Sequence, residues 1–589
     1  MIPQAHAHLH PPMINGMDTK QLKAVGLLIL AVLVLWSFAA TLIAQKEPSA
    51  TLPQFTSRFD ASQAYETARQ FHAKYPNRPL GSIESRQSSG FVIQRLQGLG
   101  YTVSFTHFDS KIAGRTQVGR NIFAFKQGAV DETLAVIVHY DTRQNAAQDT
   151  MDSAAGIGIL IELARIFADA TLHRSLLIIA SDGREWGMLG ARDMAQSNPQ
   201  RERLVAVLSL EGVGAGKISG FSLDTAGQIG GSTPAWLRQV ALDAAAQQGL
   251  PVTSPSGVRE FLDKALVFSS ADEGPFLNAG IPAINLSVQS SEPAPQGTGD
   301  LPAQGPYEAL QEAGIQKYGL AAEQIVQALD GLPEIPRESM RSFCVTDCKY
   351  LSPSAIFILL WLSFVPMLAT LYFHFLNNHR YLALKRILRE LIGLFLTVLP
   401  FAALYYAIVL FRLVRLIRVY SYYPPNPTGA VLTNLSWLLL CALFTVGLIV
   451  GGTCYALFRF AAGKLAQADF YVSKTILLTV FACVIAAALV YNPYWAVLFL
   501  LLPAWIWGLV GMGKGYGGSA ANALWIIAAG IPYYAVLVYY SSSLKLGGKA
   551  VWYNILCLST GMFTLEGFLL AAATIAIGIR LLSIQSIRA

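Results

Sequence analysis

Cysteine and charged residues are scarce in this chain of 589 residues. All six cysteines lie beyond residue 343, which excludes a disulfide framework for the first half of the chain. Charged residues make up 13% of the sequence and hydrophobic residues 53%, which excludes both a disordered chain and a purely soluble protein of ordinary composition. The net charge of +7 comes largely from Lys and Arg beside apolar runs, and the sequence has no nucleic-acid motif. We therefore expect no nucleic-acid partner.

Long apolar runs are abundant instead. Residues 24–44 contain no charged side chain and follow Lys20 and Lys23. At about 1.5 Å per residue, such a run can cross a hydrocarbon core of about 30 Å. Because the run is longer than the apolar core of a secretory signal peptide, we predict an uncleaved anchor with the N-terminus in the cytoplasm.

Seven further spans are predicted in the second half of the chain. They are centred in residues 355–376, 391–411, 435–458, 475–491, 495–510, 520–540 and 557–579. The predicted organisation is a cytoplasmic tail (1–23), an anchor (24–44), an extracytoplasmic domain (45–350) and a seven-span helical bundle among membrane lipids (351–589). Basic loops on the predicted cytoplasmic side agree with this orientation.

A few charges interrupt the apolar half. Arg412, Arg415 and Arg418 recur every third residue and form one cationic stripe. An interfacial helix explains this stripe, and binding of an anionic lipid headgroup or substrate is the alternative. Glu566 falls inside the last span, where we expect it to face the bundle or to be protonated.

The segment 45–350 alternates strand and helix patterns. Strands are predicted at 121–125, 134–138, 175–180 and 205–210, and helices at 61–75, 84–99, 155–168 and 187–197. Continuous apolar strands separated by helices predict an α/β fold, a three-layer sandwich with a mostly parallel sheet covered on both faces.

Histidine and acidic residues gather where the apolar strands end. His139 and Asp141 follow the first of these strands, Glu185 follows the second, and Glu211 follows the third. Because open α/β sheets hold ligands at the carboxyl edge, we expect these side chains to lie close together. Imidazole and carboxylate groups are normal zinc ligands, and a carboxylate can bridge two metals about 3.5–4 Å apart. The pattern therefore indicates a divalent-metal site, with Asp152 in the connection after the first strand.

Several short motifs recur in order along the same segment. They are YPNRPLGS at 75–82, GRNI at 119–122, HYD at 139–141, DSAAG at 152–156, DGREWGMLGA at 182–191, LEG at 210–212, ADEGPF at 271–276 and AGIP at 279–282. Through these motifs, about residues 60–330 resemble the aminopeptidase-Y and glutamate-carboxypeptidase family of di-zinc exopeptidases, the twenty-eighth metallopeptidase family. The resemblance implies a zinc-exopeptidase-like fold and a zinc-dependent aminopeptidase-type hydrolase.

The resemblance also assigns roles to individual residues. The implied metal ligands are His139, Asp152, Glu185 and Glu211. Among them, Asp152 corresponds to the bridging carboxylate, and Glu211 stands where the family usually has Asp. Asp141 corresponds to the residue that orients His139, and Asp272 is a supporting residue of the site.

Two positions depart from the family pattern. Arg184 stands at the position of the general base, and a guanidinium cannot accept a proton at usable pH. Gln296 is the best match to the second metal's last histidine, and no His occurs between His173 and His374. The charge of Arg184 can neutralise carboxylates in place of a metal. We therefore expect one zinc ion or none.

Three functions follow from this pattern. The first is a membrane-anchored aminopeptidase or amidohydrolase that acts on peptide or amide substrates through a reduced metal site. The second is a non-catalytic pseudopeptidase that binds substrate or scaffolds a membrane-protein complex; the architecture also resembles the exopeptidase-like subunit of the GPI transamidase complex. The third makes the bundle the functional part. A bacterial inner membrane with a periplasmic domain is favoured, and an endoplasmic reticulum membrane with a luminal domain is the alternative.

Overall fold

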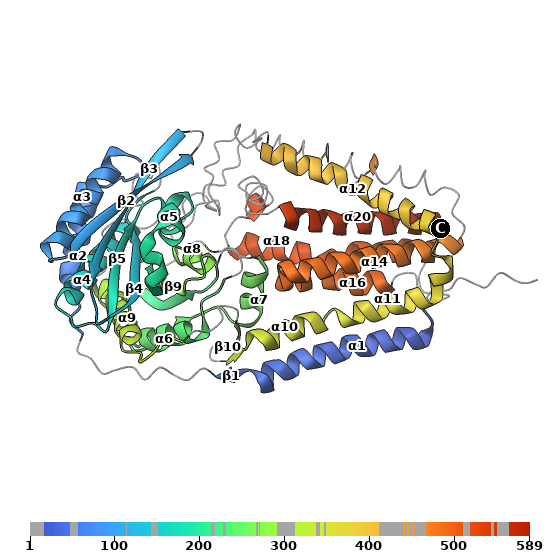
Figure 1. The fold of residues 1–589 in the computed structure, drawn as a ribbon, viewed down its shortest axis with the longest axis horizontal. Helices are drawn as coiled ribbons and strands as arrows, with labels where there is room; N and C mark the ends of the chain where they lie inside the picture. The colour runs from blue at the N-terminus through green and yellow to red at the C-terminus, as the bar shows by residue number, and fades with distance from the viewer. Residues whose placement is uncertain are drawn as a thin grey trace, which may run out of the picture.

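A computed structural model describes most of the chain. The described residues are 17–46, 57–112, 115–142, 151–213, 218–227, 231–266, 269, 271–290, 312–336, 342–346, 349–410, 467–509, 519–543, 547–550 and 565–588, with a few isolated positions between 441 and 453. They form an α/β domain (residues 57–336) beside a long helical bundle, as Figure 1 shows.

The α/β domain is built on an eight-stranded mixed sheet with the order β2-β3-β5-β4-β6-β9-β7-β8. The strands are β2 (Thr102–Ile112), β3 (Arg115–Lys126), β4 (Val130–His139), β5 (Arg174–Ser181), β6 (Leu204–Leu210), β7 (Ile218–Asp224), β8 (Val252–Thr253) and β9 (Ala283–Ser290). The central strands β5, β4, β6 and β9 are parallel. The prediction of a mostly parallel sheet holds for this centre. On its two sides, β3 runs antiparallel to β5 and β7 runs antiparallel to β9, and the edge strand β2 runs antiparallel to β3.

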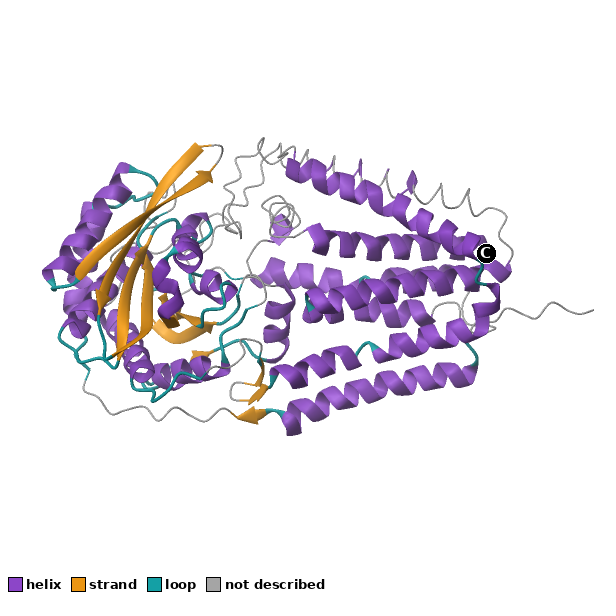
Figure 2. Ribbon diagram, in the orientation of Figure 1, coloured by secondary structure: helices purple, strands orange, loops and turns teal. Residues whose placement is uncertain are grey.

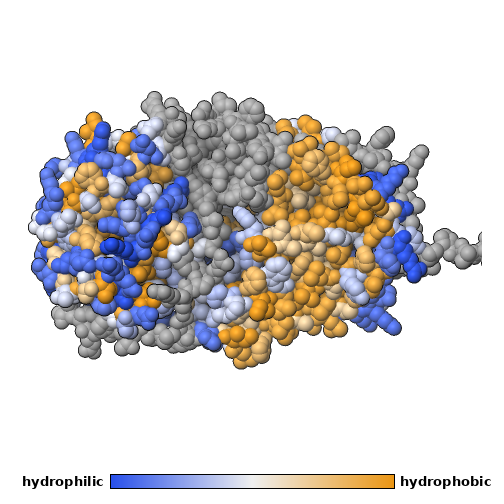
Figure 3. Space-filling view, viewed as in Figure 1, coloured by the Kyte–Doolittle hydropathy of each residue, from blue (hydrophilic) through white to orange (hydrophobic). Residues whose placement is uncertain are grey.

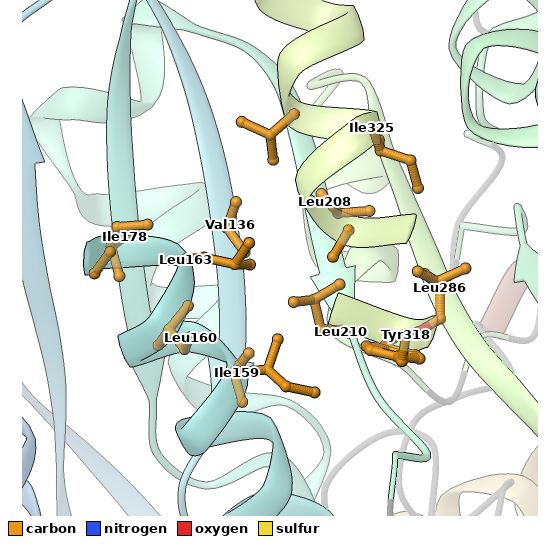
Figure 4. Packing of buried hydrophobic residues seen from close by; sticks show 14 of the residues in the cluster. Val136, Ile159, Leu160, Leu163, Ile178, Leu208, Leu210, Leu286, Tyr318 and Ile325 are labelled. Atoms are coloured by element: carbon orange, nitrogen blue, oxygen red, sulfur yellow. Dashed lines mark hydrogen bonds between the residues drawn. The ribbon is translucent and has the colours of Figure 1, made fainter. Parts of the chain in front are cut away.

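Helices cover both faces of the sheet (Figure 2). The helices of the domain are α2 (Ala61–Lys74), α3 (Ile83–Gly98), α4 (Met151–Ala168), α5 (Leu189–Ser197), α6 (Ala235–Ala246), α7 (Gly257–Leu266), α8 (Glu273–Asn278) and α9 (Glu312–Asp330). Alternate residues of β4 enter different cores: Val136 packs with Leu163 of α4 on one face, and Ile137 packs with Met194 of α5 on the other. Figure 4 shows the first of these cores. Burial on both faces explains why the strands read as continuous apolar runs.

The bundle contains apolar helices that lie roughly along one direction (Figure 1). They are α1 (Thr19–Phe38), α10 (Pro353–Leu362), α11 (Val365–Asn378), α12 (Leu384–Leu410), α14 (Gln467–Tyr491), α15 (Pro493–Ala496), α16 (Leu502–Leu509), α17 (Ser519–Ala528), α18 (Ile531–Ser543) and α20 (Leu565–Arg588). Within the described residues, three helical segments are long and apolar enough to cross a membrane: Thr19–Ile43, Pro353–Tyr381 and Tyr471–Tyr491. The surface of the bundle is largely hydrophobic, as Figure 3 shows.

Several features predicted for the membrane half lie outside the described residues. These are most of the span 435–458 and the stripe of Arg412, Arg415 and Arg418. The backbone of Glu566 belongs to α20, but its side chain is not described.

A small three-stranded sheet joins the two parts. It has the order β1-β11-β10, with β1 (Gln45–Lys46) directly after the first long helix and β11 (Lys349–Leu351) directly before α10. The strand β10 (Phe343–Thr346) pairs with β11. The chain thus leaves and re-enters the bundle through one sheet.

Candidate functional site

His139 and Asp141 lie together at the carboxyl end of β4, as the sequence predicts. His139 is the last residue of β4 and is buried, and its Nδ1 lies 3.4 Å from Oδ1 of Asp141. Burial disfavours protonated His139, but the carboxylate of Asp141 outweighs that effect, and the pKa of His139 rises to about 9. Asp141 therefore lies beside the imidazole and favours its protonated form.

Asp141 also holds the loop after β5. Its two carboxylate oxygens accept hydrogen bonds from the backbone N–H groups of Arg184 (3.1 Å) and Glu185 (3.3 Å). The loop turns sharply because Gly183 and Gly187 both have positive φ angles, at 77° and 96°. These two bonds fix the position of the Arg184 and Glu185 backbones beside the end of β4.

Arg184 joins two acidic side chains that the sequence assigns to metals. Its Nη1 lies 2.8 Å from Oε1 of Glu185. Its Nη2 and Nε donate to the two oxygens of Glu211, at 2.6 and 3.3 Å. The paired contact with Glu211 is a fork geometry that guanidinium groups favour and that is stronger than a single hydrogen bond. A permanent cation therefore lies between Glu185 and Glu211.

The ligands for two metal ions are not assembled in the part of the chain that the structure describes. No group of three or more His, Cys, Asp or Glu side chains there is arranged to hold a metal ion. Arg184 takes two of the expected ligands, Glu185 and Glu211, as ion-pair partners. Two of the expected ligands are therefore engaged by a cation in the described part of the chain.

Two predicted ligands cannot be placed fully. Asp152 lies in the first turn of α4, next to Ser153, but its side chain is outside the description. Gln296 is outside the described residues altogether. Gly156, four residues after Asp152, brings α4 close to β4, since a Cβ there would stand 2.7 Å from Cγ1 of Val138.

Glu211 is held from several sides at the end of β6. Its backbone N–H donates to Leu286 O, and the hydroxyl of Tyr318 donates to its carbonyl oxygen. The backbone N–H of Asp272 donates to its Oε1 at 3.1 Å. Asp272 thus lies beside Glu211.

Two neighbouring acids are buried in the same region. Burial and the nearby Glu211 raise the pKa of Asp272 to about 7. Burial and the nearby Asp224 raise the pKa of Glu273 well above its usual value. Oδ1 of Asp272 and Oε2 of Glu273 have no hydrogen-bond partner among the described residues.

Two further residues of the site were not identified as functional from the sequence. Asp182 is buried under the loop and accepts hydrogen bonds from the Tyr140 hydroxyl and the Ser85 hydroxyl, both at 3.2 Å. Burial and the nearby Asp141 raise the pKa of Asp182 to about 8. The motif 182–191 contained this residue, but only its burial reveals the perturbed carboxyl group.

Arg78 is the second such residue. It is fully buried and lies over the ring of Phe71 at 4.7 Å. Its Nε donates to Tyr140 O, and its Nη2 donates to the hydroxyl of Ser153, both at 2.8 Å. Arg78 therefore ties the end of β4 to the first turn of α4, where His139 and Asp152 stand. Its place in the motif 75–82 was the one signal available from the sequence.

Comparisons with known proteins agree with the resemblance. Residues 121–314 match the model of peptidase family M28. These residues form an M28-like domain. The chain is 22% identical to the alkaline phosphatase isozyme conversion protein of Escherichia coli, over 38% of this chain and 70% of that protein. It is 34% identical to a probable zinc metalloprotease of Pyrenophora tritici-repentis, over 15% of this chain and 22% of that protein. The chain therefore spans about a fifth of the fungal relative.

Among solved structures, the chain aligns with a zinc aminopeptidase from Bacillus subtilis. The alignment has 15% identity and a TM-score of 0.39, and it covers 48% of this chain and all of that one. A glutaminyl cyclase from Porphyromonas gingivalis aligns with 18% identity and a TM-score of 0.38, over 46% of this chain and all of that one.

Proposed function

We propose that this chain is a membrane-anchored protein whose M28-like domain lies outside the cytosol and binds peptide or amide groups at a degenerate metal site, without the two-metal hydrolysis of the family. The observation that carries the proposal is the position of Arg184 between Glu185 and Glu211. Its guanidinium neutralises carboxylates that would otherwise attract metal ions. It also leaves the general-base position without a proton acceptor.

Binding remains possible because the polar groups of the site are retained. Arg184 is 20% exposed, so its guanidinium can still be reached by a substrate carbonyl or carboxylate. Asp272 and Glu273 each keep one carboxyl oxygen without a hydrogen-bond partner in the described part of the chain. Both carboxyl groups are buried, so Arg184 is the group proposed to contact the polar end of a peptide or an amide.

Metal analysis tests the proposal. After dialysis against a chelator and re-addition of zinc, the purified full-length protein should retain less than one zinc ion per chain. The Arg184→Glu variant restores an acid at the general-base position and releases Glu185 and Glu211, so its zinc content should rise. Arg203→Glu changes the charge equally at an exposed position and should bind no more zinc than the original chain. Two tightly bound zinc ions in the original chain would reject the proposal.

A hydrolase with a single zinc ion is the second candidate. The pair of His139 and Asp141 favours it, because an imidazole oriented by a carboxylate is a common metal ligand. The similarity to a fungal protein described as a probable zinc metalloprotease also supports this candidate. Such an enzyme would draw on His139, Asp152 and Glu211.

An activity assay separates the two candidates. The full-length protein is incubated with a panel of aminoacyl amides and added zinc, cobalt or manganese. The first proposal predicts no hydrolysis above the level of the His139→Ala variant. Hydrolysis that His139→Ala abolishes would establish the second candidate.

A further inference from the structure

The helix α7 stands at the junction between the α/β domain and the bundle (Figure 1). Phe261 of α7 contacts Tyr494 of α15 with ring centroids 5.4 Å apart, and Trp36 of α1 at 6.4 Å. Phe343 of β10 stacks on Tyr494 at 6.1 Å. Leu266, the last residue of α7, packs against the hydrophobic core of the bundle. The apolar side of α7 is therefore seated on the bundle.

A hydrogen-bonded cap strengthens this contact. The side-chain amide of Asn492, between α14 and α15, donates to Lys264 O (3.1 Å) and Ala265 O (3.3 Å). These are carbonyl groups in the last turn of α7, which lack partners within the helix. The Oδ1 atom of Asn492 accepts a bond from Trp495 N and so caps α15 as well. One side chain thus joins the end of α7 to the start of α15.

The polar side of α7 is fixed to the α/β domain. Glu260 pairs with Arg238 of α6 at 2.9 Å, and both side chains are buried. Lys264 donates to the hydroxyl of Ser232 at 2.6 Å and lies 3.4 Å from Glu260. Because breaking a buried ion pair is expensive, α7 moves together with the structure around it.

A short connection leads from α7 to the candidate site. After Leu266, the chain reaches Ser269, whose hydroxyl donates to Oε1 of Glu273 at 2.9 Å. Asp272 follows, and its N–H donates to Glu211, while its Oδ2 accepts from Ser181. The segment that carries Asp272 and Glu273 therefore contacts the site directly, and the chain joins it to α7 through residues 267–270, of which the structure describes Ser269.

We propose that the membrane bundle positions the Asp272–Glu273 side of the candidate site through α7, with Asn492 as the positioning residue. The arrangement makes the shape of the site depend on how α14 and α15 meet. This inference rests on the proposed function, because the link matters only if the site binds a peptide or an amide.

Hydrogen–deuterium exchange of the full-length protein tests the link without any need for catalysis or binding. Asn492→Asp keeps the oxygen that caps α15 but removes the amide donors to α7. We expect amide exchange in α7 and in residues 269–278 to rise about three- to tenfold, as the loss of two hydrogen bonds predicts. Exchange in β4 and β5 should not change. Tyr494→Leu removes the aromatic contact with Phe261 instead and should also raise exchange in α7 and in residues 269–278. It replaces Asn492→Asp if that variant does not fold.

A bundle variant remote from α7 provides the control. Trp507→Phe removes a hydrogen bond to Ile526 O inside the bundle and should leave residues 269–278 unaffected. The proposal is overturned if exchange in 269–278 stays at its original rate, if the whole α/β domain accelerates uniformly, or if Trp507→Phe has the same effect. Because zinc content is measured separately, failure here is distinguishable from failure of the proposed function.

Discussion

At the scale of residues, one guanidinium changes the chemistry expected of the site. His139 and Asp141 lie 3.4 Å apart at the end of β4. Arg184 instead forms ion pairs with Glu185 and Glu211, both largely buried. The contact with Glu211 is bidentate and the contact with Glu185 is a single bond, so one guanidinium holds both carboxylates in place. On the proposed function, a guanidinium at this position replaces the group that would take a proton.

Removal of the Arg184 guanidinium should show how far the stability of the domain depends on its ion pairs. Arg184→Met leaves Glu185 and Glu211 without a countercharge, so we expect a loss of about 2–4 kcal/mol in the free energy of unfolding at neutral pH. Zinc should then raise the melting temperature of the variant and have no effect on the original chain. Thermal unfolding with and without zinc measures both. A variant as stable as the original chain would contradict the proposed role of Arg184.

The buried Asp182 should make stability depend on pH. Its pKa is about 8 in the folded chain and 3.8 in an ordinary setting, so the folded state binds more protons between these values. Stability contributed by the protonated form is present at low pH and is lost as pH rises toward 8. Asp182→Asn should reduce the decrease between pH 6 and pH 8 by about 1–3 kcal/mol. Unfolding curves at several pH values test this, with the exposed Asp169→Asn as control.

The site residues that could be predicted from the strand pattern alone share one property: each stands at or just after the end of a strongly apolar strand. His139, Glu185 and Glu211 were recognisable because strand ends of a parallel sheet meet at one edge. Arg78 was not recognisable as part of this site, because arginine is usually exposed and its burial depends on partners from distant segments. The bond between Arg184 and Glu211 likewise depends on tertiary geometry.

At the scale of elements, close packing of helices on the central strands sets the position of the edge. α4 lies between β4 and α2, and two glycines permit its approach on either side. Gly156 faces Val138 of β4, and Gly158 faces Ala64 of α2. Close packing at these two glycines thus sets the position of the helix that carries Asp152.

Two glycine substitutions test this packing. A Cβ at Gly158 would stand 2.2 Å from Ala64 O, so Gly158→Ala should destabilise the α/β domain by about 1–3 kcal/mol. Gly90 lies in α3 with no atom within 4 Å of its added Cβ, so Gly90→Ala should stabilise the domain by about 0.5–1 kcal/mol. Chemical denaturation of the two variants measures the contrast. Equal effects would show that the approach of α2 does not limit α4.

Strands with continuous apolar sequence were predictable, and strands with mixed polar sequence were not. β4, β5 and β6 contain the predicted strands, because burial on both faces leaves continuous apolar residues. β2 was not predicted, since it is an edge strand with many polar residues, and β3 extends well beyond its apolar centre. The antiparallel part of the sheet therefore became visible only in the structure.

At the scale of the whole molecule, the surfaces of the two halves differ in hydropathy. Figure 3 shows hydrophilic surface over the α/β domain and hydrophobic surface over most of the bundle, with hydrophilic residues again at the far end of the bundle. A hydrophobic belt between two polar ends is the arrangement that a lipid bilayer favours. It is in keeping with a membrane anchor, and the side on which the α/β domain lies is part of our proposal.

Site-specific labelling can determine that side. Lys74 on α2 and Arg380 beyond α11 are both exposed and lie in different parts of the molecule. In a chain whose native cysteines are replaced by serine, Lys74→Cys should react with a membrane-impermeant maleimide added outside intact cells or spheroplasts. Arg380→Cys should react only after the membrane is opened. The reverse pattern would place the α/β domain in the cytosol.

The ion pairs of Arg184 bear on whether the charge balance of this site depends on the supply of metal ions. A metal ion is acquired from the surroundings and can be taken away again, whereas a guanidinium is made together with the chain. The charge between Glu185 and Glu211 is therefore present from the moment of folding, whatever the supply of zinc. On the proposed function, a hydroxamate, which binds through a metal ion, should bind only weakly here, and depletion of zinc should leave the fold of this edge intact.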